Sequence, residues 1–493
     1  MSLVALDKST LILSLPERLI MPGGFSLRLV VFVFFVLILA LEDEQAVAGE
    51  EVTDFYNVVA PAGADPWLWT HHGQYYVVVT TGGNVTLARS RSLSTLGAGE
   101  RKVVWSPSPG TPVAKDLWAP ELHRLGEAWY IYVAADDGEN ANHRMYVLEN
   151  QADDPFEGKF VFKSQIVDPN NDRWAIDGTV LKVGEALYFV WSGWEGAEDI
   201  QQNLYIAPMS NPWTLSGTRV EISRPTHRWE TKGGPPAVNE GPQVLVKGSL
   251  IHLIYSASGS WTDAYCLGRL TAKIDSDLLS PASWKKHDKP VFASAHGVFG
   301  PGHCTFTKSP DGREDWLVYH AARFQGAAWN RLIRAQPFSW DPDGLPRFGS
   351  PAPPDQPITI PSGEPPRQRY EAESATLAGE ARIVQQPSAS RGAKVQLSGS
   401  ADSSLTIMAT AKEAGAYIVS IRFINTSEQH KLATQVLTVN DGAPQRVAYP
   451  SAGPADWSNA FVSVSLNVGP NRIRLRQGER AAEIDCIDVT PQE

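Results

Sequence analysis

Cysteine is scarce in this sequence of 493 residues, and positive charge is outnumbered by negative charge. The three cysteines, Cys266, Cys304 and Cys486, allow at most one disulfide bond and cannot form a disulfide framework. No Cys-x-x-Cys pair or histidine-rich cluster indicates a zinc site. The 43 lysines and arginines stand against 54 aspartates and glutamates, which gives a formal charge of −11. This balance disfavours nucleic acid and anionic membrane surfaces as partners.

Long apolar runs are equally rare. The run "LVVFVFFVLILAL" covers residues 29–41, and its thirteen residues are too few for a membrane span but typical of a signal peptide. Because Ala46-Val47-Ala48 follows as a cleavage pattern, we expect residues 1–48 to be a signal peptide or N-terminal targeting segment of a secreted protein. The intervening acidic "EDE" keeps an uncleaved anchor as the alternative, and only then do we expect contact with a membrane.

Helical periodicity is hard to find in the remainder of the chain. Instead, a turn glycine followed by a run of aromatic and β-branched residues recurs five times, at Gly73, Gly126, Gly184, Gly248 and Gly312. Each copy is typical of the second arm of a β-hairpin. Five similar units of short strands predict a five-bladed β-propeller over residues 49–350. A β-sandwich built from the same strands is the alternative.

The composition changes after residue 350. The stretch "SPAPPDQPITIPSGEPP" is rich in proline, so we expect residues 351–369 to be a linker or closing segment. Residues 370–493 contain further short strands, such as "AYIVSIRFIN" and "FVSVSLNV", and predict a β-sandwich (jelly-roll) module. The predicted fold is therefore all-β, with a five-bladed propeller followed by a sandwich.

A polar residue precedes each repeated glycine by five to nine positions. These residues are Asp65, Glu121, Asp177, Glu240 and His303. The innermost strands of a propeller run along its central channel, so residues at the heads of those strands converge on one axial pocket. Carboxylates gathered there raise one another's pKa, and glycosidic bond cleavage needs one protonated and one ionised carboxyl. Taken singly, each residue is more typical of turn chemistry.

The strings "DPWLW", "WAPELH", "AIDGTVL", "VNEGPQVL" and "FGPGHCTF", in this order, resemble glycoside hydrolase family 43 over residues 54–351. The resemblance implies a five-bladed propeller, an inverting mechanism and no organic cofactor. By position, Asp65 corresponds to the general base, Glu240 to the general acid, and Asp177 to the residue that raises the pKa of Glu240 and orients it. The base and acid of an inverting pair are expected roughly 6.5–9.5 Å apart.

Within the family, the sequence is most similar to secreted α-L-arabinofuranosidases that act on arabinan or arabinoxylan, including exo-acting enzymes. We therefore expect a plant cell-wall polysaccharide or oligosaccharide as substrate and a monomeric enzyme. β-Xylosidase and endo-arabinanase activities on the same scaffold remain alternatives, as does a non-catalytic sugar-binding propeller.

Further residues are candidates for substrate or ion binding. The resemblance implies that His303 lies beside a central ion, commonly calcium, and the alternative is a neutral histidine hydrogen-bonded inside the channel. Arg331 and Arg334 are candidates for contacts with sugar hydroxyls, but on a strand they face opposite sides, so only one can reach the pocket. Three tryptophans are candidates for the pocket wall: Trp67, Trp118 and Trp194, the last in an apparent loop.

The strings "YEAESATL", "GPNRIRL" and "EIDCIDV" of the C-terminal unit resemble carbohydrate-binding modules of families 6 and 35. The resemblance implies a structural calcium held by Glu371, Glu373 and Asp485, whose oxygen donors suit this ion. Arg391 departs from the pattern, because glycine is common at its position.

Three more residues of this unit carry expectations. Trp457 and Tyr449 are candidates for a sugar-binding aromatic or for the core, and Cys486 is expected to be buried and inert.

Overall fold

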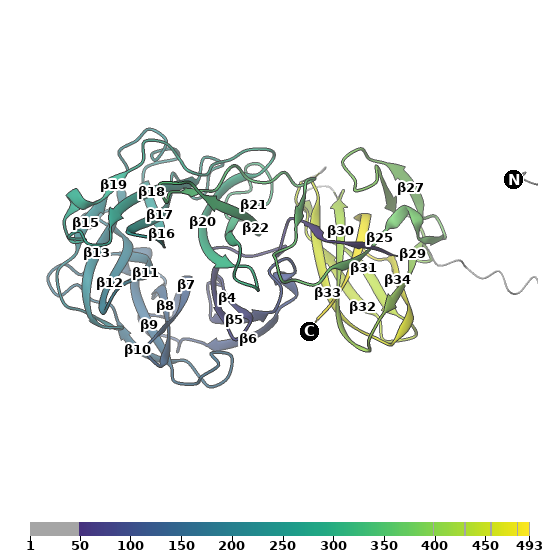
Figure 1. Ribbon diagram of the computed structural model, residues 1–493, viewed down its shortest axis with the longest axis horizontal. Coiled ribbons are helices and arrows are strands. Elements are labelled where there is room, and N and C mark those ends of the chain that lie inside the picture. The colour runs from purple at the N-terminus through teal and green to yellow at the C-terminus, as the bar shows by residue number, and fades with distance from the viewer. Residues whose placement is uncertain (1–48, 398, 428–429, 454–455, 481, 493) are drawn as a thin grey trace, which may run out of the picture. The chain divides into compact units, whose positions relative to one another are not determined.

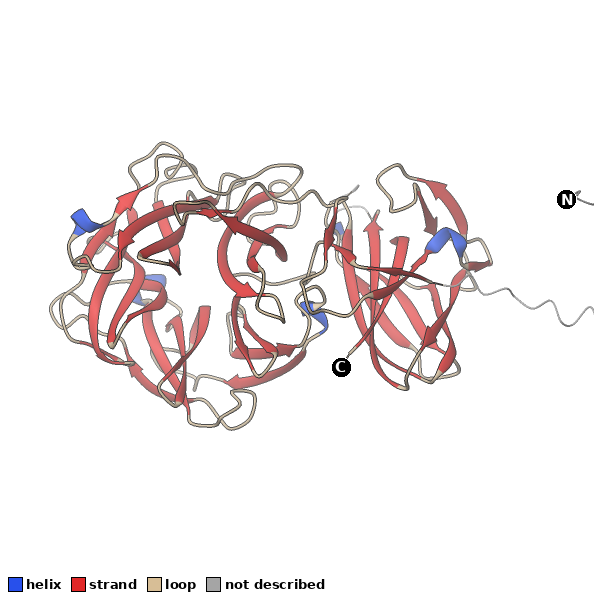
Figure 2. Ribbon diagram, viewed as in Figure 1, coloured by secondary structure: helices blue, strands red, loops and turns tan. Residues whose placement is uncertain are grey.

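The structure is a computed structural model that describes residues 49–492 apart from 398, 428–429, 454–455 and 481. The predicted targeting segment 1–48 lies outside the described residues. Strands dominate the described chain, and the helices in it are short 3-10 turns (Figure 2). They are η1 (Leu96–Ala98), η2 (Asn140–Asn142), η3 (Pro281–Ser283) and η4 (Ala372–Ser374). None of the described helices is long and apolar enough to cross a membrane.

Five antiparallel units of strands follow one another along the chain and form a ring (Figure 1). Unit 1 contains β3 (Trp67–His71), β4 (Gln74–Val78), β5 (Val85–Ser90) and β6 (Glu100–Trp105). Unit 2 contains β7 (Lys115–Leu125), β8 (Ala128–Asp136), β9 (Arg144–Asn150) and β10 (Val161–Gln165). Unit 3 contains β11 (Ala175–Val183), β12 (Ala186–Trp194) and β13 (Gln201–Asn211), with β14 (Thr214–Leu215) and β15 (Val220–Ser223) paired to β13.

The last two units complete the ring. Unit 4 contains β16 (Ala237–Lys247), β17 (Leu250–Ala257), β18 (Cys266–Lys273) and β19 (Lys285–Lys286). Unit 5 contains β20 (Phe299–Lys308), β21 (Asp315–Ala322), β22 (Arg331–Trp340) and β23 (Pro346–Arg347). A short parallel pairing of β13 with β16 joins units 3 and 4. The prediction of five bladed repeats is confirmed, and each repeated glycine lies in the turn between the first two strands of its unit.

Buried apolar side chains hold neighbouring units together. The core between units 2 and 3, for example, combines Tyr132 and Val147 with Phe189 and Trp191. A buried side chain of this size contributes roughly 1.5–3 kcal/mol.

The C-terminal unit consists of two sheets that share one apolar core. One sheet contains β1 (Glu50–Val52), β25 (Arg367–Glu371), β27 (Arg382–Gln385), β28 (Ala393–Gln396), β30 (Gly415–Asn425), β33 (Ser458–Leu466) and β35 (Ala482–Pro491). The other contains β26 (Thr376–Ala378), β29 (Ser404–Ala411), β31 (Ala433–Val439), β32 (Gln445–Tyr449) and β34 (Gly469–Gln477). Along β29, Leu405, Ile407 and Ala409 alternate into this core, as a half-buried strand requires.

All three cysteines are free and buried, and the expectation for Cys486 is confirmed. Burial also raises the pKa of its thiol well above the usual value. Trp457 and Tyr449 are buried as well, at 3% and 0% exposure, so the core alternative holds for both.

The N-terminal residues close the ring of strands. Strand β2 (Asp54–Tyr56) pairs with β24 (Pro357–Thr359), which lies inside the predicted linker. The buried side chain of Asn57 then donates to the carbonyl of Ala335 on β22 (2.8 Å) and accepts from the N–H of the same residue (3.0 Å). Backbone hydrogen bonds join Val59 and Ala60 to Ile333. An amide side chain thus pairs with β22 as a neighbouring strand would.

We predict that Asn57→Ala lowers the free energy of unfolding by about 2–4 kcal/mol, because it leaves the buried N–H and C=O of Ala335 without partners. Urea denaturation followed by tryptophan fluorescence measures the change. Asn170→Ala, which removes an exposed side-chain hydrogen bond to Thr218, is the matched control and should stay within about 0.5 kcal/mol. Equal effects of the two substitutions would contradict the role of Asn57 in ring closure.

Candidate active site

The inner strand of each unit has a kink at its head. The residue at the kink has a positive φ in all five units: Asp65 (55°), Ala119 (41°), Asp177 (56°), Gly241 (54°) and His303 (37°). In units 2 to 5 the kink coincides with a shift of register against the next strand. Such bulges re-aim a side chain, and positive φ outside glycine is uncommon and concentrates at functional sites.

The kinks refine the predicted equivalence of the five polar residues. Asp65, Asp177 and His303 occupy equivalent positions at the kink itself. Glu240 precedes the kink residue Gly241, and Glu121 lies two positions after the kink residue Ala119. Four of the five residues lie before or in the first half of an inner strand, as predicted, whereas Glu121 lies beyond the middle of β7.

Asp65 is surrounded by hydrogen-bond donors and positive charge. Its backbone N–H donates to Nδ1 of His320 (3.0 Å), and its Oδ2 accepts from the hydroxyl of Thr80 (2.5 Å). Its Oδ1 lies 3.4 Å from Nη1 of Arg331 and 3.3 Å from Nδ1 of His303. Burial alone would raise the pKa of Asp65, but His303, His320 and Arg331 together hold it well below its usual range.

The two histidines beside Asp65 are neutral at neutral pH. Burial lowers the pKa of His303 and lowers that of His320 to about 3. A neutral His320 with a bare Nδ1 also accepts the N–H of Asp65, as the geometry requires. The permanent charge that keeps Asp65 ionised is therefore the guanidinium of Arg331.

Glu240 has the opposite electrostatic environment. It is 8% exposed, and its Oε1 accepts a hydrogen bond from the phenol of Tyr265 (2.8 Å). Burial raises the pKa of Glu240 to about 7, with a further contribution from the charge of Asp65, although Tyr265 and Arg331 oppose the rise. This carboxyl can therefore hold a proton near neutrality, as a general acid must.

Asp177 interacts electrostatically with both of the other carboxyls. Its Oδ2 accepts the backbone N–H of Gly241 (3.0 Å) and lies 3.8 Å from Nδ1 of His303. Burial and the charges of Glu240 and Asp65 raise the pKa of Asp177 well above its usual value. Asp177 and Glu240 thus titrate as a coupled pair. The N–H of Gly241 donates to Asp177 and the phenol of Tyr265 donates to Glu240, so each carboxyl of the pair has one donor that favours its ionised form.

His303 contacts two of the carboxyls and a hydroxyl group. Its ring bridges Asp65 and Asp177, and its backbone N–H donates to the hydroxyl of Ser256 (2.8 Å). Among the described residues, no set of three metal-binding side chains converges here with ligand atoms within 4.8 Å of one another.

Glu121 is fixed by two polar neighbours at the strand heads. Its Oε1 accepts from Nε2 of Gln243 (2.5 Å), and its Oε2 lies 2.9 Å from Nε2 of His123. The ring of Trp67 lies 4.6 Å from the ring of His123, and its Nε1 donates to the carbonyl of Leu122. Glu121 and Trp67 therefore belong to one packed cluster.

The two arginines of β22 separate as the strand period predicts. Arg331 reaches Asp65 and also donates to the carbonyl of Ser260 (2.9 Å). Arg334 faces away and donates to the carbonyl of Ala352 (2.7 Å). Of the two arginines, Arg331 is therefore the one that contacts Asp65, and Arg334 does not.

The expectation that Trp194 lies in a loop is also wrong. It is the last residue of β12, is 4% exposed, and stacks on Trp174 at 4.9 Å in the core between units 2 and 3. Trp118 is half-buried and stacks on His143 at 4.0 Å. The sequence does not show whether an apolar residue near the end of a strand belongs to the strand or to the next loop, because predicted strand ends are uncertain by several positions.

Several residues of the site escaped the sequence reasoning. They are Thr80, Gln243, Ser256, Ser260, Tyr265 and His320. Tyr265 rests against Gly302, where a Cβ atom would come within 2.1 Å of its ring. His320 lies within the repeated aromatic run of unit 5, "DWLVYHA", and a polar residue inside that run was the available signal.

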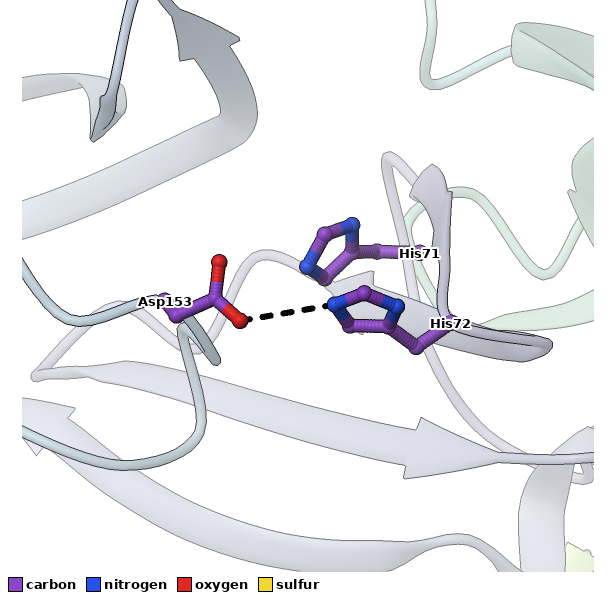
Figure 3. Close-up of side chains that lie close together, drawn as sticks. All are labelled: His71, His72 and Asp153. Carbon is purple, nitrogen blue, oxygen red and sulfur yellow. Dashed lines mark hydrogen bonds and ion pairs between the residues drawn. The ribbon is translucent and has the colours of Figure 1, made fainter.

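A separate group of potential metal ligands lies near the turn between β3 and β4. His71, His72 and Asp153 bring one ligand atom each within 4.8 Å of one another, the only such set among the residues that the structure describes (Figure 3). The guanidinium of Arg124 already donates to Nε2 of His71 (3.1 Å) and pairs with Asp153 (3.0 Å). Arg124 therefore compensates the negative charge of Asp153 in this cluster.

The predicted calcium ligands of the C-terminal unit are close but do not converge fully. Asp485 pairs with Arg422 and accepts from Ser390, which also donates to Glu371. One oxygen of Glu373, Oε2, is buried without a partner. Burial raises the pKa of Glu371 to about 7, and the charges of Asp485 and Glu373 add to the rise. A surplus of negative charge and an unsatisfied oxygen fit a cation, although Arg422 supplies part of the compensation.

An ionised carboxylate beside a carboxyl that stays protonated near neutrality, at the centre of a ring of β-units, defines the active site of a general acid/base hydrolase. The sequence model of "Glycosyl hydrolases family 43" matches residues 55–346, and the chain belongs to this family.

Three proteins illustrate the similarity. An extracellular exo-α-(1→5)-L-arabinofuranosidase of Streptomyces avermitilis is 40% identical over 319 residues, which are 62% of this chain and 65% of that protein. The chain thus spans slightly less than two thirds of that relative. The crystal structure of an α-L-arabinofuranosidase from Lactobacillus brevis is 36% identical, with a TM-score of 0.57, over 61% of this chain and 97% of that one.

The third protein is similar in fold alone. An exo-β-1,3-galactanase structure from Phanerochaete chrysosporium is 18% identical, with a TM-score of 0.53, over 90% of this chain and 99% of that one. This similarity extends beyond the ring of strands into the C-terminal unit.

We predict that Glu240→Gln stabilises the protein at pH 8 and has no effect at pH 4. The folded state raises the pKa of Glu240 from 4.5 to about 7, so it binds a proton more tightly than the unfolded state, and the wild type loses stability as the pH rises between these values. The neutral amide avoids this loss, which amounts to at most about 3 kcal/mol. Thermal unfolding at several pH values measures it.

Glu230→Gln is the matched control with the opposite sign. Burial alone would raise the pKa of Glu230, but the N–H of His227 and the ammonium of Lys286 lower it. This substitution should therefore destabilise the protein at pH 8. A destabilising effect of Glu240→Gln at pH 8 would contradict the raised pKa.

Proposed function

We propose that this protein is a secreted, exo-acting α-L-arabinofuranosidase that removes terminal α-L-arabinofuranosyl residues from arabinan- or arabinoxylan-type polysaccharides with inversion. The observation that carries the proposal is the pair of opposite pKa shifts, lowered for Asp65 and raised to about 7 for Glu240. The names of the Streptomyces and Lactobacillus relatives support the substrate class, and the word "extracellular" in the former supports secretion.

In this proposal Glu240 is the general acid. It donates its proton to the glycosidic oxygen as the bond from that oxygen to the anomeric carbon breaks. Asp65 is the general base, which takes a proton from the water that forms a new bond on the opposite face of the sugar. After the reaction Asp65 is protonated and Glu240 ionised, and exchange with solvent restores both. Attack from the opposite face converts the α-linkage into a β-configured product.

Asp177 acts through its neighbours. Its carboxylate is anchored by the N–H of Gly241, next to Glu240 in sequence, and its charge favours a proton on Glu240. Arg331 donates to Asp65 and is the candidate for contact with a sugar hydroxyl. Glu121, His303, Trp67 and Trp118 remain proposed substrate-site residues.

For the C-terminal unit we propose a β-sandwich (jelly-roll) carbohydrate-binding module. The predicted boundaries are 49–350 for the propeller, 351–369 for the linker and 370–493 for the module, but β1 (Glu50–Val52) and the whole of β25 (Arg367–Glu371) belong to a sheet of this unit. Two sheets over a shared core support the sandwich. Because Trp457 and Tyr449 are buried, neither offers a ring for sugar binding in this arrangement.

We further propose that Glu371, Glu373 and Asp485 hold a structural calcium ion. Adding calcium to EDTA-treated protein should then raise the melting temperature, since a ligand at 100 times its Kd stabilises by about 3 kcal/mol. The shift should be lost in Glu373→Gln and kept in the control Glu413→Gln, which changes an exposed side chain. The proposal is overturned by a wild-type melting temperature that does not respond to calcium.

The activity itself is tested with an aryl α-L-arabinofuranoside and with linear α-1,5-arabinan. We expect release of single arabinose units, with β-arabinofuranose as the first product by proton NMR, and a loss of at least about 10²–10⁴-fold in kcat for Glu240→Gln. An α-configured first product, or substantial activity of the variant, would contradict the assigned roles. Release of xylose from an aryl xyloside or of internal arabinan fragments would favour the alternative activities.

A further inference from the structure

Trp329 is an exposed aromatic side chain next to the site. It lies between β21 and β22 and is 66% exposed, although tryptophan is usually largely buried. Its Nε1 donates to the hydroxyl of Ser260 (3.2 Å), which lies between β17 and β18 of the neighbouring unit. A hydrogen bond thus holds the indole in place while leaving most of its surface in solvent.

A second indole braces the first. The ring of Trp261 meets the ring of Trp329 edge-on, at 6.3 Å between centroids and 66° between planes. Trp261 is half-buried and packs over two glycines: a Cβ atom on Gly259 would lie 2.7 Å from its ring, and one on Gly233 would lie 3.4 Å from its Nε1. Gly233 belongs to the segment that leads into β16 and Glu240.

The same segments hold the partners of the catalytic carboxyls. The carbonyl of Ser260 accepts from Arg331, whose other nitrogen lies 3.4 Å from Asp65. Tyr265, which follows in the same connection, donates to Glu240. The N–H of Gly326 also donates to Asp263, which ties the two connections together. The indole of Trp329 is therefore held by Ser260, which is linked to Asp65 through Arg331 and lies in the same connection as Tyr265, the partner of Glu240.

We propose that Trp329, braced by Trp261 and Ser260, is the platform on which the sugar next to the scissile bond stacks, on the leaving-group side. This inference rests on the proposed function. The terminal arabinofuranosyl residue must lie against Glu240, Asp177 and Asp65, which are buried or largely buried. A flat apolar surface that remains mostly in solvent suits the part of the chain that extends out of the pocket.

Steady-state kinetics with two substrates separate this role from catalysis. α-1,5-Arabinotriose places a sugar on the platform, whereas methyl α-L-arabinofuranoside has only a methyl group there. For Trp329→Ala we expect kcat/KM on the triose to fall about tenfold through KM, and kcat/KM on the methyl glycoside to stay within about twofold. Trp329→Phe should recover most of the loss. Phe162→Ala, which removes an exposed ring on β10, is the control and should change neither value.

A binding measurement keeps the inference independent of turnover. In Glu240→Gln protein, which retains the platform, calorimetry with arabinotriose should give a Kd about tenfold higher after the additional Trp329→Ala change. An unchanged Kd overturns the inference, as does an equal loss of kcat/KM on both substrates. A wild-type enzyme that releases no arabinose overturns the proposed activity, whereas the Kd comparison still decides on the platform.

Discussion

The left-handed kink at the head of each inner strand is the constraint on which the site depends. Without it, a strand that enters the ring would point alternate side chains along the sheet faces, into the packing between units. With it, Asp65, Asp177 and His303 turn toward one another, so that one imidazole nitrogen lies within 3.8 Å of two carboxylates. Gly241 accepts the same conformation without strain and frees the preceding position for Glu240.

The buried carboxyls are chemically similar, but their electrostatic surroundings differ, and Arg331 lies beside only one of them as a hydrogen-bond donor. Asp65 lies beside His303, His320 and Arg331, whereas the hydrogen-bond donor of Glu240 is the phenol of Tyr265. An asymmetric placement of positive charge among buried acids therefore suffices to separate the proton donor from the ionised base.

The sequence predicted those parts of the molecule that repeat. Five turn glycines and five polar strand heads predicted the ring and brought Asp65, Asp177 and Glu240 to its centre. Contacts made by residues outside the repeat could not be predicted, because Tyr265 and Ser260 lie in a connection whose path depends on tertiary packing. The prediction that Trp194 lies in a loop was wrong for the same reason. The end of β12 is set by its pairing with β13, and the sequence of β12 alone does not specify this pairing.

Ser260 contacts both the proposed sugar platform and the arginine beside the general base. Its hydroxyl accepts from the exposed Trp329, and its carbonyl accepts from Arg331 at the general base. A shift of this residue would move the platform and alter the hydrogen bond that keeps Asp65 ionised. Because misplacement of reacting groups by about 1 Å can cost roughly 10²-fold in rate, the position of Ser260 matters for the alignment of Arg331 with Asp65.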